Sequence, residues 1–258
     1  MAEHVRSEKS NGILTLTLDR PEKKNALTRA MYRALGEAID AAEHDPEVRC
    51  VLIQSEGDLF TAGNDLSDFA AVGNGQAEDA GRPGENPLLV ALARAKTPLV
   101  AAVQGKAVGV GVTLLLHCDL VFVADDALLT TPFVNLALVP EAASSLLLPA
   151  RIGHTRAFSM FVLGEAVDAQ KAVAWGIANA VVPRAELRAR ARAAAEAVAQ
   201  RPPAAVAITK ALMRDPEALR VRMDLEGGHF VKQLSSPEAR EAFAAFAQKR
   251  APDFSKVR

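Results

Sequence analysis

The sequence predicts a layered α/β domain, because short β-rich segments alternate with helical patterns along its first half. Half of the 258 residues are hydrophobic, which is enough for a sizeable core, and 30 basic residues nearly balance 31 acidic ones. This balance lacks the basic surface that is typical of nucleic-acid-binding proteins. No segment resembles a signal peptide or a membrane span, so we expect a cytoplasmic protein with no nucleic-acid or membrane partner.

The elements of the first half follow in order along the chain. Strands are predicted over residues 13–18 and 50–54, with an amphipathic helix over 28–43 between them. Thr28 is a residue type that caps helix N-termini. Further strands are expected over 99–103 and 120–124, and a helix over 110–117 lies between those two strands.

The remaining chain divides into a loop and a helical C-terminal part. Residues 71–87 contain four glycines and two prolines, so we expect a mobile loop there. Alanine, arginine and glutamate dominate residues 184–200 and predict a helix, and further helical patterns run over 204–247 after Pro202-Pro203. We therefore expect a core over residues 1–200 and a separate helical region over 201–258.

Two glycine-containing segments suggest a binding site for an oxygen atom. They cover residues 60–66 and 104–111 and lie about forty residues apart. Glycine lets the backbone bend sharply and approach a ligand closely, so the N–H groups after Gly63 and Gly109 could point at one shared oxygen. This arrangement is typical of an oxyanion hole, although such glycines also occur in tight turns and close helix contacts.

The cysteines and histidines indicate no metal site. Cys50 and Cys118 both lie in apolar runs, where a reduced cysteine behaves as a small hydrophobic residue. The five histidines are scattered singly, and His117 is interpreted as a hydrogen-bonded residue inside a helix. No group of potential ligands has metal-binding spacing, so we expect no metal.

An ordered series of motifs resembles the crotonase superfamily, which contains the enoyl-CoA hydratases and isomerases. The series comprises residues 18–27, 60–66, 97–105 and 118–121, then Gly164, Ala169, Ala172, 176–178 and Val181. The resemblance implies a crotonase-like spiral of ββα units, a C-terminal helical region used for trimer formation, and a pocket for an acyl-CoA thioester. It implies a homotrimer or a dimer of trimers. Coenzyme A is then part of the substrate, and no separate cofactor is expected.

The resemblance also implies roles for individual residues. Asn64 and Val110 would supply the two backbone donors of the oxyanion hole. The residues expected at the coenzyme A moiety are Lys23, Lys24, Ala26, Ala62, Gly63, Asp65, Leu66 and Gly109. From its position alone, Asp65 also suits the cap of a following helix.

The reaction depends on the acids beside the oxyanion hole. Hydratases of this superfamily use two glutamates, but Thr113 and Phe133 stand at those positions here. Glu141 follows Pro140, and this pattern resembles the peroxisomal-type Δ3,Δ2-enoyl-CoA isomerase branch, in which that glutamate shuttles the proton. Glu141 also suits the first turn of a helix. Two alternatives stay open: a hydratase or other lyase that uses a different acid, and a catalytically silent protein that binds acyl-CoA.

Overall fold

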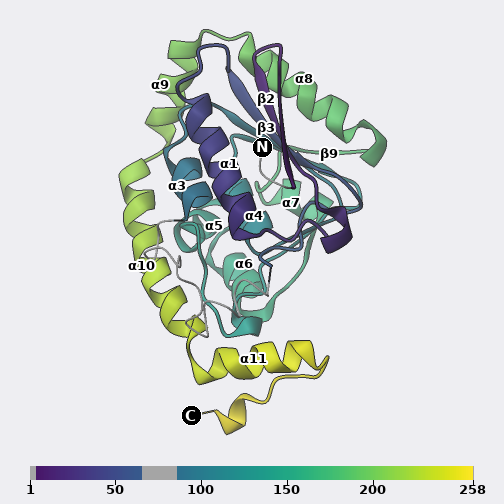
Figure 1. Cartoon of the computed structure of the whole chain (residues 1–258), viewed down its shortest axis with the longest axis vertical. Helices are drawn as coiled ribbons and strands as arrows, with labels where there is room; N and C mark the ends of the chain where they lie inside the picture. Colours follow the sequence, from purple (N-terminus) through teal and green to yellow (C-terminus); the bar gives the residue numbers. More distant parts are fainter. Residues whose placement is uncertain (1–3, 66–85, 258) are drawn as a thin grey trace.

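A six-stranded sheet forms the centre of the computed structural model, which describes residues 4–65 and 86–257 (Figure 1). Its strands, in spatial order, are β1 (Val5–Ser10), β2 (Ile13–Leu18), β3 (Cys50–Ser55), β4 (Leu99–Val103), β6 (Leu120–Ala124) and β9 (Ala180–Val182). β1 pairs antiparallel with β2, whereas the other neighbours run parallel. A smaller sheet contains β5 (Lys106–Val108), β7 (Leu128–Thr130) and β8 (Val167–Asp168).

The four predicted strands are confirmed as β2, β3, β4 and β6. All residues of β2 and β4 are buried, as expected for parallel strands that are covered on both faces. The predicted α/β layering is therefore correct. β1 and the short strands β5, β7, β8 and β9 were not predicted from the sequence.

Helices cover both faces of the large sheet. On one face, α8 (Leu187–Ala199) packs its buried Leu187 and alanines on residues of β3, β4 and β6. On the other face lie α1 (Arg29–Ala42) and α3 (Pro87–Arg94), which pack against each other. Thr28 caps α1 as predicted, since its side chain accepts a hydrogen bond from the backbone N–H of Met31 at 3.3 Å.

The chain between the strands forms mostly short helices. The predicted helix over 110–117 is α4 (Val110–Thr113) followed directly by a 3-10 helix, η2 (Leu114–His117). The other short helical elements are η1 (Pro21–Lys23), η3 (Val134–Leu136), α5 (Ser144–Ile152), α6 (His154–Phe158), η4 (Ser159–Leu163), α7 (Ala169–Ala174) and η5 (Arg184–Glu186).

The chain after Pro183 is helical, as predicted. After α8, the helices α9 (Pro203–Met213), α10 (Pro216–Leu234) and α11 (Pro237–Ala247) run along one side and the lower end of the molecule in Figure 1, and η6 (Phe254–Lys256) follows. No helix in the described ranges is both long and apolar enough to cross a bilayer. Most of the loop predicted over 71–87 lies outside the described residues, and its last residue, Pro87, is the first residue of α3.

Candidate functional site

The two glycine segments lie side by side at the carboxyl ends of β3 and β4. Thr61 donates its backbone N–H to the Lys106 carbonyl at 3.2 Å, and the Thr61 carbonyl accepts from the Val108 N–H at 3.1 Å. A Cβ atom on Gly63 would lie 2.9 Å from the Val108 carbonyl oxygen, and one on Gly111 would lie 2.5 Å from Thr61 Cγ2. Glycine is therefore required at both positions by close contact between the segments.

The backbone N–H groups of the two predicted oxyanion donors have no partner among the described residues. Within the described ranges, neither the N–H of Asn64 nor that of Val110 has a hydrogen-bond partner. The glycines before them have φ of +91° at Gly63 and +55° at Gly109, which is backbone geometry that other residues rarely adopt. Val110 is completely buried. A buried backbone donor such as that of Val110 is nearly always paired, so the lack of a partner among the described residues suits a ligand oxygen at this point.

Tyr32 of α1 fixes the side chain of Asn64. Its buried hydroxyl donates a hydrogen bond to Asn64 Oδ1 at 2.5 Å. Burial, and then the negative charge of Glu141, raise the pKa of Tyr32 well above its ordinary value, so the hydroxyl stays protonated. Tyr32 was missed in the sequence analysis. Its place on the buried face of an amphipathic helix was the available signal, since a buried tyrosine hydroxyl needs a partner.

Glu141 supplies a carboxyl group with an unusual environment. Its Oε1 atom is buried and has no hydrogen-bond partner among the described residues. Burial, and then the negative charge of Glu226, raise the pKa of Glu141 to about 8. A carboxyl group with a pKa near working pH exchanges protons readily in both directions, which suits a general acid and base.

The two positions without the hydratase carboxylates are filled by side chains that cannot act as bases. Thr113 is completely buried, and its hydroxyl donates to the Val110 carbonyl at 3.4 Å. The Phe133 ring lies beside Gly109, with Cε1 4.0 Å from where a Cβ of that glycine would be. Phe133 also packs on Phe161 at 6.0 Å between ring centroids, so this wall of the site is apolar.

His117 supports the chain directly after Glu141. Its Nε2 lies 2.8 Å from the Ala142 carbonyl, which can only accept, so Nε2 carries the proton. Nδ1 then accepts from the Arg214 guanidinium at 2.8 Å. Burial, and then the charge of Arg214, lower the pKa of His117 to about 3, and the ring stays neutral. The interpretation of His117 as a hydrogen-bonded helix residue is confirmed.

Some of the residues predicted to bind coenzyme A line a hollow beside the oxyanion segments. The hollow measures about 460 Å³, and its walls include Lys24, Ala62, Lys106, Val108 and Leu128. Within the described part of the chain, Lys24 and Lys106 form no ion pair, so their charges are available to a phosphate-bearing ligand.

The other predicted coenzyme A residues lie close by in the chain but do not line this hollow. Lys23 is exposed at the end of η1, and the Ala26 carbonyl accepts from Arg20 at 3.0 Å. Asp65 forms a part-buried ion pair with the same arginine at 2.7 Å, which ties residues 20–26 to the first glycine segment. Leu66 lies outside the described residues.

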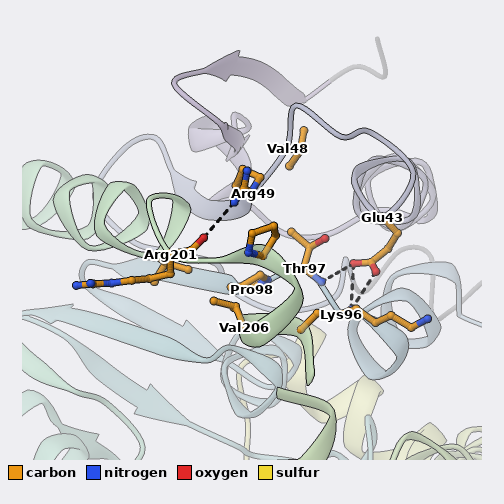
Figure 2. A pocket seen from close by; sticks show the side chains of 11 residues that line it. Glu43, Val48, Arg49, Lys96, Thr97, Pro98, Arg201 and Val206 are labelled. Carbon is orange, nitrogen blue, oxygen red and sulfur yellow. Dashed lines mark hydrogen bonds between the residues drawn. The ribbon is translucent and has the colours of Figure 1, made fainter. Parts of the chain in front are cut away.

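A second hollow, of about 240 Å³, includes Arg49 and Pro98 in its lining, the residues directly before β3 and β4, so it lies at the amino ends of these strands (Figure 2). In Figure 2, the Glu43 carboxylate accepts from the backbone N–H groups of Lys96 and Thr97, and Arg49 donates to the Arg201 carbonyl. The Glu43 carboxylate and the Arg49 guanidinium in this second hollow are therefore used in hydrogen bonds between neighbouring segments of the protein. Ligands of parallel α/β sheets bind at the carboxyl ends of the strands, which favours the first hollow as the site.

The two cysteines are core residues. Cys50 and Cys118 are both free and buried, and burial raises the pKa of each thiol to about 12. Their interpretation as core residues is confirmed. Across residues 4–65 and 86–257, no group of three or more histidine, cysteine or carboxylate side chains could hold a metal ion.

Comparison with known proteins places the chain in a family. The profile of the family described as "Enoyl-CoA hydratase/isomerase" matches residues 8–257. The chain is 34% identical to 1,2-epoxyphenylacetyl-CoA isomerase of Escherichia coli over 99% of both chains, and 35% identical to a probable enoyl-CoA hydratase of Rhodobacter capsulatus over 97% of both.

Solved structures agree with the family profile. An enoyl-CoA hydratase/isomerase from Pseudoalteromonas atlantica superposes with a TM-score of 0.93 at 41% identity, over 98% of this chain and 100% of that chain. The names of these relatives span isomerase and hydratase activities, so they define the family and the crotonase-like fold rather than one reaction. The chain is a member of the enoyl-CoA hydratase/isomerase family.

Proposed function

We propose that this protein is an acyl-CoA double-bond isomerase that converts 3-enoyl-CoA into trans-2-enoyl-CoA, as in fatty acid β-oxidation. The observation that carries the proposal is Glu141, whose buried Oε1 has no partner among the described residues and whose pKa is raised to about 8. One such carboxyl group suffices for isomerisation, because the reaction consumes no water.

Each step can be assigned to a group of this chain. The Glu141 carboxylate removes a proton from C2, and the electrons of the broken C–H bond move into the thioester carbonyl to form a dienolate. The backbone N–H groups of Asn64 and Val110 hold the negative oxygen. The resulting carboxylic acid returns its proton to C4, which leaves the double bond between C2 and C3.

The acyl-CoA substrate would extend from this centre into the hollow lined by Lys24 and Ala62. The lysine ammonium groups of Lys24 and Lys106 suit the phosphates of coenzyme A, whereas Val108 and Leu128 offer apolar contacts. Lys23, Ala26, Gly63, Asp65, Leu66 and Gly109 stay predicted coenzyme A contacts on the family resemblance. No further cofactor is required by the proposed chemistry.

We also propose that the enzyme works in the cytoplasm as a homotrimer or a dimer of trimers, assembled through residues 201–258. Large apolar side chains are exposed in this region; on α9, Ile208 is 60% exposed, Leu212 83% and Met213 73%. Such a row is typical of a surface covered in an oligomer. Light scattering should give three or six times the 27.3 kDa of one chain.

The activity is tested with trans-3-hexenoyl-CoA. We expect the wild-type protein to form the conjugated 2-enoyl product, and the Glu141→Gln variant to lose at least about a thousandfold in kcat while it still binds the thioester. The exposed Glu37 of α1 gives a matched control, because Glu37→Gln should keep the wild-type rate. An undiminished rate for Glu141→Gln would overturn the assignment.

The same experiment separates the alternatives. A probable hydratase is among the relatives, so crotonyl-CoA is offered in parallel. Hydration faster than isomerisation would favour a hydratase that uses another acid. Tight thioester binding without any turnover, and without exchange at C2 in deuterated water, would favour a silent acyl-CoA-binding protein.

A further inference from the structure

The turn that follows Glu141 has a backbone that is unfavourable for its own residues. Ala142 and Ala143 have φ of +60° and +55°, in the left-handed region that non-glycine residues rarely occupy. Ala143 is also the residue before α5, and its methyl side chain cannot cap the helix. The turn therefore needs hydrogen bonds from elsewhere to keep its shape.

Glu226 of α10 supplies these hydrogen bonds from more than eighty positions further along the chain. Its Oε2 accepts from the Ala143 N–H at 2.6 Å, and its Oε1 accepts from the Ser145 N–H at 2.9 Å. The residue is only 6% exposed, so both contacts are shielded from water. The carboxylate caps α5 in place of the missing side-chain cap, through charge-assisted hydrogen bonds.

The opposite side of the turn is held as well. His117 donates to the Ala142 carbonyl, and Arg214 at the end of α9 fixes the His117 ring. The turn is thus fixed from both sides, and each side depends on a residue of the C-terminal helices. Glu141 is the residue that enters this turn, so its direction depends on the same contacts.

We propose that Glu226 is a positioning residue for proton transfer, because it fixes the turn that carries Glu141. The inference rests on the proposed isomerase function and extends it to a residue on α10. A displacement of about 1 Å at a reacting group can cost on the order of a hundredfold in rate. The expected signature is a lower kcat with an unchanged KM, since Glu226 lies against the turn rather than the coenzyme A hollow.

The first test is steady-state kinetics of Glu226→Gln. The amide retains one acceptor oxygen but turns an N–H₂ group toward the second backbone donor. We expect kcat for trans-3-hexenoyl-CoA to fall about 10- to 100-fold with KM within about twofold of wild type. Asp224→Asn is the matched control, because Asp224 is exposed on the same helix and pairs only with Arg220 in the described structure. The control should keep the wild-type kcat.

The pH profile separates positioning from a general loss of folded protein. The charge that acts on Glu141 is that of Glu226, and the charge that acts on Glu226 is that of Arg222 on the same helix. Tyr32 on α1 is the other titratable group near Glu141, and it stays neutral. Glu226→Gln removes a negative charge near Glu141, which makes ionisation of Glu141 easier. The midpoint of kcat/KM should therefore move to lower pH, whereas fewer folded molecules would leave the midpoint unchanged.

Two further measurements keep the test decisive. If Glu226→Gln does not fold, Glu226→Asp keeps the charge but shortens the reach, so kcat should fall while the pH midpoint stays near the wild-type value. Hydrogen exchange of the 141–146 segment needs no turnover, and Glu226→Gln should raise it about 10- to 100-fold relative to wild type and Asp224→Asn.

The outcomes distinguish the two proposals. Absence of isomerisation by the wild-type protein would overturn the proposed function, while faster exchange of the 141–146 segment in Glu226→Gln would still support the role of Glu226 in fixing the turn. Wild-type kcat, pH midpoint and exchange in that variant would overturn the positioning role. A raised KM with unchanged kcat would also overturn it.

Discussion

The buried carboxyl group of Glu141 should make the folded protein less stable as the pH rises. Its pKa is raised from 4.5 to about 8, so the folded chain keeps a proton that the unfolded chain has already lost. The contribution of Glu141 to the free energy of unfolding is therefore largest below about pH 4.5, falls between that value and about pH 8, and then levels off. The full loss is about 5 kcal/mol, at ~1.4 kcal/mol for each tenfold change in the ionisation constant.

Glu141→Gln removes the titrating group and therefore this pH dependence. The free energy of unfolding of the variant, relative to wild type, should increase by about 4 kcal/mol between pH 5 and pH 9. Any fixed cost of burying the amide is the same at each pH and cancels in this comparison. Such a gain in stability is expected when a residue that destabilises the fold, here a buried ionisable carboxyl group, is kept for catalysis and is then removed.

Denaturant unfolding at several pH values measures the effect. Wild type, Glu141→Gln and the exposed control Glu37→Gln are compared at one protein concentration, because oligomers unfold in a concentration-dependent way. The control should follow the wild-type curve at every pH. If the free energy of unfolding changed with pH in the same way for wild type and Glu141→Gln between pH 5 and 9, the raised pKa of Glu141 would be refuted. The argument that Glu141 acts as a base near neutral pH would then fail with it.

Three other substitutions have defined outcomes. Tyr32→Phe removes the hydroxyl that holds the Asn64 side chain and should lower kcat/KM about 5- to 10-fold, the effect of one neutral hydrogen bond, in steady-state assays; a wild-type value would contradict this. Gly111→Ala places a Cβ 2.5 Å from Thr61 Cγ2, so it should push the two oxyanion segments apart and lower kcat about a hundredfold. An unchanged kcat would contradict this, because it would mean that the segments accommodate the methyl group without losing the oxyanion geometry. The buried Lys210 of α9 forms an ion pair with Asp119 at 2.7 Å, so Lys210→Ala leaves that carboxylate without its partner and should lower the free energy of unfolding by about 3 kcal/mol, as measured by urea unfolding; a change under about 1 kcal/mol would contradict this.

The parallel strands were predictable, whereas the outer strand was not recognised. β4 is buried on both faces and reads as a continuous apolar run, and β2, also buried on both faces, alternates leucine with the β-branched residues Thr15 and Thr17. β1 is an edge strand whose residues are exposed after Val5, so its sequence gives no such run. The signal for it was the turn: Asn11-Gly12, with φ of +53° and +76°, is typical of a two-residue hairpin connection.

Some residues of the candidate site could also be predicted from the sequence, and others could not. The glycine segments and Glu141 were accessible from sequence, because close backbone approach requires glycine and because the family pattern marks the glutamate. The partners of Glu226 and Tyr32 were not, since each side chain acts across a long sequence separation that only the packing of α10 and α1 brings to the site. A carboxylate that caps a distant helix leaves no local pattern of the kind that marks a cap within its own turn.

The most direct test of proton transfer by Glu141 follows a deuterium label from C2 to C4. A 3-enoyl-CoA labelled at C2 is converted in ordinary water in a single turnover, and the product is analysed for deuterium at C4. Because Glu141 Oε1 is buried, one carboxyl group that removes and returns the same hydron should deliver part of the label to C4. Product without any deuterium at C4, formed at an undiminished rate by Glu141→Gln as well, would contradict the mechanism.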